Sequence, residues 1–135
     1  METRFISTFL IISLLFLTPV FSSNPTGIPE GISKSINEGD CKELARFFNN
    51  NIELMILDNE DVYSKSQAEL IMKDFFSKYP PAEFVIVHEG GRETSRYAIG
   101  RLVTEKTVFR LYFLLQKLED NFFIHQMRIE PDDKE

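Results

Sequence analysis

The feature that most constrains this fold is a run of strand-like segments between residues 82 and 130. Apolar and polar side chains alternate through it, and short polar turns interrupt it, as in consecutive antiparallel strands. Turn-forming residues at 89–93, 105–106 and 119–121 separate the segments. The pattern therefore predicts four antiparallel strands, at 84–88, 96–104, 107–117 and 122–130.

The turn at Glu105-Lys106 sets the register of the two central strands. Counting outward from it places Arg101 opposite Arg110, with Leu102 opposite Phe109. Alternation then sorts the side chains onto two faces. One face is expected to be the core, with small residues that leave room for a helix: Ala98, Gly100, Leu102, Phe109, Leu111, Phe113 and Leu115. The other is an outer face too apolar to be left entirely to water: Tyr97, Ile99, Arg101, Val103, Val108, Arg110, Tyr112 and Leu114.

The last strand changes its buried parity, because Phe122 and Ile124 share one face while Met127 and Ile129 have the opposite parity. A β-bulge near residues 125–126 would reconcile the two halves.

The first half of the chain reads as mainly helical. A short helix is predicted from Pro29 to Gly39, and a second begins after the capping residue Asp40 and ends at 49–51. A buried strand follows at 52–57, then a polar turn at 58–61 and a brief strand at 62–63. A long amphipathic helix begins at a cap provided by Ser64 or Ser66 and ends before Pro80. We expect Leu70 to widen its apolar stripe.

Residues 1–22 have the pattern of a secretory signal peptide. Arg4 gives a positive flank, residues 9–17 are almost entirely apolar, and the small Ser22 stands at the expected cleavage point. The apolar run is shorter than a membrane span, although an uncleaved anchor is the alternative. We therefore expect an exported protein, periplasmic or extracellular, with a flexible segment at 23–27, one α+β domain at 28–131 and a tail at 132–135.

Composition disfavours several partners and cofactors. The net charge of −6 argues against nucleic acid, which needs a cationic face, and no membrane partner is expected after signal cleavage. Cys41 is the only cysteine, so no internal disulfide can form, and we expect it to be a buried apolar residue. The acidic stretch 58–61 lacks the spacing of a calcium loop. No metal, cofactor or catalytic motif is predicted, and His88 and His125 should lie about 14 Å apart.

The order of elements resembles the nuclear transport factor 2-like superfamily, the cystatin-like cone fold. The segments that carry the resemblance are ISKSINEGD at 32–40, SQAE at 66–69 leading to Phe75-Phe76, YAIG at 97–100 and FFIHQMRI at 122–129. Within it, the chain looks like an uncharacterised exported bacterial family of unknown function. The resemblance implies a bent antiparallel sheet wrapped around a long helix preceded by two short helices, often a pocket between them, and frequent homodimers through the outer sheet face. An isomerase site of that superfamily is disfavoured, because the first helix has no Tyr and strand 107–117 has no acid.

The arginine pair is the most specific functional signal. Like charges directly opposite each other on a sheet repel, so Arg101 and Arg110 should need a carboxylate or a bound anion, and Glu130 is the candidate partner within the chain. The outer face is then a candidate homodimer interface; the alternative is two solvated arginines lying over Tyr97 and Tyr112. Candidate ligand-binding or interface residues are Tyr97, Arg101, Arg110, Tyr112, His125, Arg128 and Glu130.

Two classes of function remain open. The preferred one is a non-catalytic exported module that binds a small apolar or anionic ligand or a protein. The alternative is a small-molecule isomerase, lyase or hydrolase that uses His125 or Tyr112 with Arg101 in the cone pocket. An open cavity with at least two convergent polar groups would favour the enzyme, and a cone packed with Phe side chains would exclude it.

Overall fold

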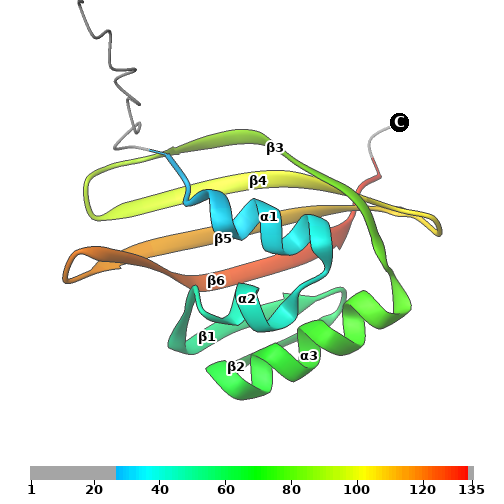
Figure 1. Ribbon diagram of the computed structural model, residues 1–135, viewed down its shortest axis with the longest axis horizontal. Coiled ribbons are helices and arrows are strands. Elements are labelled where there is room, and N and C mark those ends of the chain that lie inside the picture. Colours follow the sequence, from blue (N-terminus) through cyan, green and yellow to red (C-terminus); the bar gives the residue numbers. More distant parts are fainter. Residues whose placement is uncertain (1–26, 134–135) are drawn as a thin grey trace, which may run out of the picture.

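The computed structural model describes residues 27–133 and shows three helices on one side of a curved, unclosed sheet (Figure 1). The helices are α1 (Glu30–Glu38), α2 (Cys41–Ala45) and α3 (Lys65–Lys78). The strands are β1 (Phe48–Ile56), β2 (Asn59–Ser64), β3 (Pro81–Gly91), β4 (Ser95–Thr104), β5 (Val108–Leu118) and β6 (Asn121–Pro131). The predicted α+β fold is confirmed.

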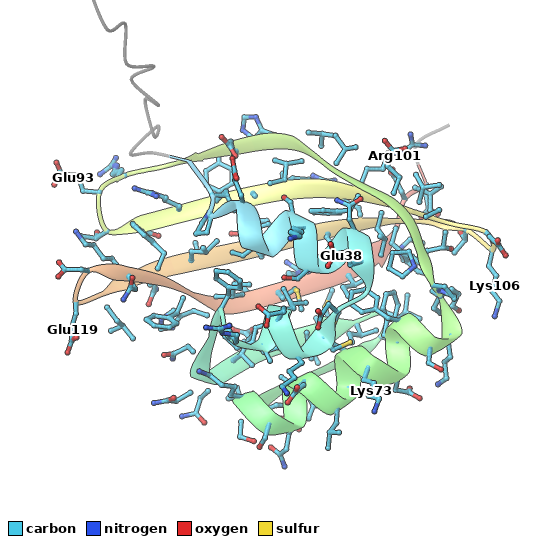
Figure 2. All side chains as sticks on the ribbon, in the orientation of Figure 1. Glu38, Lys73, Glu93, Arg101, Lys106 and Glu119 are labelled. Carbon is cyan, nitrogen blue, oxygen red and sulfur yellow. The ribbon has the colours of Figure 1, made fainter. Side chains whose placement is uncertain are left out.

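The sheet has the order β2-β1-β6-β5-β4-β3. Every neighbouring pair is antiparallel except β1–β6, which is parallel. The last four strands form the predicted meander, with the turns near Glu93 and Glu119 at one end of the sheet and Lys106 at the other (Figure 2). No helix within residues 27–133 is long and apolar enough to cross a membrane. The predicted signal peptide lies outside the described residues.

The helix ends follow from local chemistry. Gly39 ends α1 in the left-handed conformation, with a φ of 64°, which glycine adopts without a Cβ clash. The Asp40 side chain then caps α2 by accepting a hydrogen bond from the Glu43 N–H. Ser64 caps α3 together with Gln67 in a reciprocal capping box. The alternative cap at Ser66 is therefore wrong.

Two sequence-based boundaries and one burial assignment need correction. The second helix ends at Ala45, and β1 begins already at Phe48, which pairs with Ile124 of β6 and has a fully buried side chain. The expected polar turn at 58–61 is shorter: the turn is Leu57-Asp58, and Asn59–Ser64 pairs with β1 as a complete strand. Leu70 is 66% exposed and does not widen the buried stripe of α3.

The core lies between the helices and the inner face of the sheet. All seven residues predicted for this face are buried, Gly100 included. The other six are at most 2% exposed: Ala98, Leu102, Phe109, Leu111, Phe113 and Leu115. Phe75 and Tyr79 of α3 pack edge-on against Phe109, with ring centroids 5.1 and 4.8 Å away. Gly100 gives room to the ring of Phe84 rather than to a helix, since a Cβ there would overlap that ring.

Candidate functional site

The outer face is the side of the sheet opposite the helices, and its register is the predicted one. Arg101 and Arg110 are direct partners on β4 and β5, as are Ile99 and Tyr112. Val85 of β3 extends the face beside Arg101, and Arg128 of β6 extends it beside Tyr112. Arginines and apolar side chains therefore alternate across four neighbouring strands.

Two of the three arginines on this face have carboxylate partners. Arg101 Nε lies 3.3 Å from Asp132 Oδ2, and Arg128 Nη2 lies 3.1 Å from Glu130 Oε1. Glu130 is the backbone partner of Arg110, yet its carboxylate pairs with Arg128 instead. The expectation that Glu130 neutralises the arginine pair is therefore wrong. Within residues 27–133, Arg110 has no ion pair.

Two shallow hollows of about 260 Å³ each flank Arg110. The structure thus gathers five of the seven predicted site residues around one guanidinium. The first hollow is lined by Arg110, Tyr112, Arg128 and Glu130. The second is lined by Val87, His88, Ile99, Gly100, Arg101, Arg110 and Asp132.

Tyr97 belongs to the same face but meets a residue that sequence reasoning did not assign to the site. Its hydroxyl lies 3.0 Å from His88 Nε2. A register shift in β3 between Ile86 and His88 brings His88 opposite Ile99 on the outer face. Strict alternation along β3 does not place His88 on the outer face. The signal that sequence reasoning missed is therefore the β-bulge.

His125 stands apart from both hollows. It is the extra residue of a bulge, since the β5–β6 register shifts between Leu114, opposite Gln126, and Leu115, opposite Ile124. The predicted bulge is thus confirmed. His125 Nδ1 lies 3.4 Å from the Asn49 side-chain amide, and its buried Nε2 has no hydrogen-bond partner within the described chain. Burial lowers the pKa of His125, because the charged imidazolium loses its hydration.

The interior of the cone is filled by side chains. Phe48, Phe113 and Met72 are fully buried between the sheet and the helices. The enzyme alternative requires His125 or Tyr112 in one cavity with Arg101. Arg101 and Tyr112 lie on the outer face in different hollows, and His125 lines neither of them. The geometry therefore does not assemble that set of residues in a common pocket.

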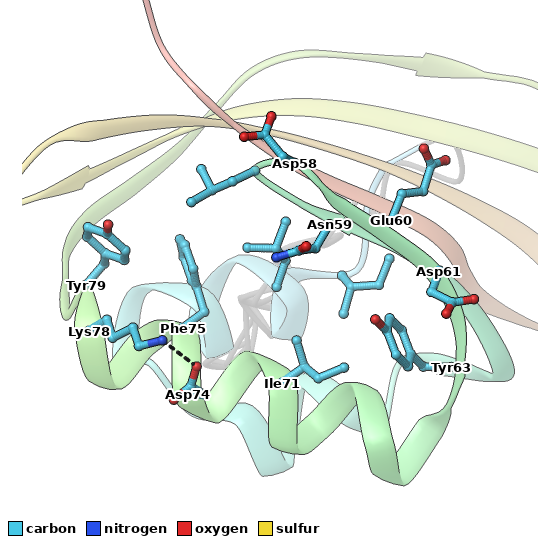
Figure 3. A pocket seen from close by; sticks show the side chains of 13 residues that line it. Asp58, Asn59, Glu60, Asp61, Tyr63, Ile71, Asp74, Phe75, Lys78 and Tyr79 are labelled. Carbon is cyan, nitrogen blue, oxygen red and sulfur yellow. Dashed lines mark ion pairs between the residues drawn. The ribbon is translucent and has the colours of Figure 1, made fainter.

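A larger groove, of about 650 Å³, opens at the edge of the sheet between α3 and the β1–β2 hairpin (Figure 3). Its floor is apolar and its rim carries Asp58, Asp61, Asp74 and Lys78. None of the candidate site residues named from the sequence lines it.

Cys41 and the acidic turn show no sign of reactivity or metal binding. Burial, followed by the nearby Asp40 and Glu69, raises the pKa of the Cys41 thiol to about 11, so the unreactive thiol form dominates at neutral pH. Within residues 27–133, no group of three or more His, Cys, Asp or Glu side chains is placed to hold a metal ion.

The curved sheet with helices on one side is the fold of nuclear transport factor 2-like proteins. A nuclear transport factor 2-like protein of unknown function from Shewanella baltica aligns over 78% of this chain and 88% of its own, at a TM-score of 0.62 and 13% identity. At that identity the likeness shows the fold alone.

The chain belongs to the family described as a domain of unknown function (DUF4783), whose family model matches residues 29–130. It is similar to the crystal structure of a member from Bacteroides ovatus, with 28% identity, a TM-score of 0.77, and coverage of 81% of this chain and 99% of that one. A member from Bacteroides uniformis is 31% identical, with a TM-score of 0.76 and coverage of 80% and 100%. No curated protein matches the chain.

Proposed function

We propose that this protein is an exported, non-catalytic interaction module that binds a second copy of itself through the outer face of its sheet. The observation that carries the proposal is Arg110, an arginine without an ion pair in the described chain, at the centre of a half-apolar face that no helix covers. Such a face is expected to be covered by a partner.

The apolar part of the face has the composition of an interface. Val85 is 48% exposed and Val87 62%, and Ile99, Tyr112 and Leu114 are only partly covered. Aromatic and arginine side chains are enriched where proteins bind each other. Four strands about 30 Å long at a spacing of about 4.8 Å span roughly 580 Å², which is close to the lower limit of about 600 Å² that each partner of a stable complex buries.

The charges favour a second copy as the partner. Three arginines and the carboxylates Glu130 and Asp132 share the face, so it carries both signs close together. A twofold axis near Arg110 would bring the arginine of one protomer towards the carboxylates of the other. That arrangement would relieve the repulsion between Arg101 and Arg110 that the register imposes.

The position of His125 favours binding over catalysis. Burial lowers its pKa and so favours the neutral form, and the residue lies outside both hollows. A general acid or base is expected to lie in the cavity that holds its substrate. The outer face offers contact area and charge, which are the requirements of recognition.

Size-exclusion chromatography with light scattering tests the proposal. We expect the wild type to elute as a dimer and Arg110→Glu as a monomer, because a carboxylate there would repel Glu130. Arg92→Glu, the same charge change at an exposed turn of the β3–β4 hairpin, is the matched control and should remain dimeric. If the wild type were a monomer at a protein concentration on the order of tens of micromolar, the dimer proposal would be wrong.

Export is tested separately by mass spectrometry of the protein recovered from the producing cell. We expect a chain that begins at residue 23. An intact N-terminus in the cytoplasmic fraction would overturn the exported assignment and leave the interface proposal standing.

A further inference from the structure

The groove between α3 and the β1–β2 hairpin is a second candidate site, distinct from the outer face. It lies at the edge of the sheet, because β2 is the terminal strand of the order. Alternation along β1 separates the two sites: Leu54 and Ile56 line the groove, whereas Met55 contacts Arg128 on the outer face. Figure 3 shows the cavity opening between the helix and the hairpin.

The floor of the groove is apolar and partly open. Ile56, Leu57, Ile71, Tyr63 and Tyr79 all pack against the core, yet each remains only partly buried. Burying such surface under a ligand is favourable by about 25 cal/mol per Å². The groove therefore has room and an apolar surface for a small organic molecule.

One wall of the groove is held rigid by aromatic contacts. The Phe75 and Tyr79 rings lie 5.2 Å apart, and Tyr79 packs edge-on against Phe109 at 4.8 Å. The face of a tyrosine ring attracts cations because of its quadrupole. Lys106 already uses this chemistry: its Nζ lies 5.5 Å from the centre of the Tyr79 ring and donates a hydrogen bond to the Lys78 carbonyl.

The rim is unevenly neutralised. On the helix wall, Lys78 Nζ lies 3.0 Å from Asp74 Oδ2 (Figure 3). On the hairpin wall, Asp58 and Asp61 have no ion pair with any cation among residues 27–133. The chain therefore neutralises the helix wall with an ammonium group of its own and leaves the carboxylates of the hairpin wall without a cation.

The hairpin turn fixes the position of the Leu57 side chain on the groove. Leu57 has a φ of 55°, a left-handed conformation that is unfavourable for a residue with a Cβ. Its N–H donates a hydrogen bond of 2.9 Å to the Ile129 carbonyl. This geometry keeps the Leu57 side chain on the groove and Asp58 on its rim.

We propose that this groove binds an organic cation with an apolar body, such as an arylalkyl ammonium compound. The apolar body lies on Ile71 and Leu57, and the ammonium group meets Asp61, which stands opposite Leu54 on the groove face of the hairpin. The inference goes beyond the proposed function, because no residue of the outer-face hollows that flank Arg110 lines the groove.

Isothermal titration calorimetry with two probes of the same shape and opposite charge tests the ligand class. We expect 4-phenylbutylammonium to bind the purified protein at least about tenfold more tightly than 4-phenylbutyrate, with affinity that falls as salt increases. Equal affinity for the two probes, or no binding of either at millimolar concentration, would overturn the proposal.

Charge-neutralising variants test the location. Asp61→Asn keeps the oxygen that accepts a hydrogen bond from the Val62 N–H, so the variant should fold. We expect it to weaken binding of the ammonium probe about threefold to tenfold, as expected for loss of one ion pair near the surface. Glu93→Gln, at the opposite end of the sheet from Lys106, is the matched control and should bind as the wild type does. Equal losses in the two variants would show that only the net charge attracts the probe.

Outcomes for the two sites are distinguishable. Arg110→Glu should leave the affinity for 4-phenylbutylammonium unchanged, and Asp61→Asn should leave the oligomeric state unchanged. If Arg110→Glu abolished probe binding, the probe would be binding on the outer face and the groove proposal would be wrong.

Discussion

The two faces of β5 differ completely although they belong to the same eleven residues. On the inner face, Phe109, Leu111, Phe113 and Leu115 are at most 2% exposed, whereas Val108, Tyr112 and Leu114 on the outer face are partly exposed and Arg110 is exposed. Between residues 108 and 115 the inner face is entirely apolar, and the outer face mixes apolar and charged groups. The comparison teaches that one face of the strand holds the fold together, while the other is available to a partner.

The largest effect should come from truncating neighbouring aromatic residues on opposite faces. Phe113→Ala should lower the free energy of unfolding by about 3–5 kcal/mol, because it leaves a cavity in a fully buried core. Tyr112→Ala should cost about 1 kcal/mol or less, since Tyr112 is only partly buried. Urea unfolding followed by circular dichroism, at low protein concentration, measures both. Equal losses would break the distinction between the faces.

Overpacking the inner face should have the next largest effect. Gly100→Ala should destabilise by about 1–3 kcal/mol, because its new methyl group overlaps the Phe84 ring. The double variant Gly100→Ala with Phe84→Leu should cost less than the sum of the two single changes. If the two single changes in unfolding free energy added strictly, the Phe84 ring would not interact with the side chain at position 100.

Charge pairs on the outer face should contribute little to the fold. The coupling between Arg101 and Asp132 should be about 0.2–1 kcal/mol and should fall in high salt, because Arg101 is more than half exposed. A double-mutant cycle with Arg101→Gln and Asp132→Asn, measured by urea unfolding, gives this term. A coupling above about 2 kcal/mol would mean that the outer face stabilises the monomer much as a buried network does.

The smallest effect concerns His125, which lies at the bulge where alternation in β6 changes. Its folded-state pKa is lowered by burial, so the neutral form is favoured in the folded state. The stability from this group is present above the unfolded-state pKa of about 6.5 and is lost as the pH falls through the lowered folded-state value. His125→Gln should therefore lose less stability than the wild type between about pH 7 and pH 5. Identical pH profiles would contradict the assignment.

Much of the fold could be predicted because it depends on local patterns. The turn at Glu105-Lys106 determined the β4–β5 register, and the change of parity around His125 revealed the bulge. Asn59 and Asp61 were assigned to a turn because they disfavour strands, yet pairing with β1 overrides that preference.

The candidate site was predictable only in part. The sequence placed Arg101 opposite Arg110, but it could not show that Glu130 would turn to Arg128 on its own strand. Side-chain direction depends on which neighbour is within reach after folding. The residues that line the edge groove were also beyond prediction, because the groove depends on how α3 packs back over the β1–β2 hairpin, and the sequence pattern does not specify that packing.

The most direct test of the central claim is a dilution series followed by amide NMR, which reports self-association residue by residue. We expect concentration-dependent shifts at outer-face positions of β4 and β5, centred on Arg110 and Tyr112, with the exposed side of α3 around Lys73 unchanged (Figure 2). Arg110→Glu should give the spectrum of the dilute wild type at every concentration. Shifts centred on the helices, or none on the outer face, would contradict the account.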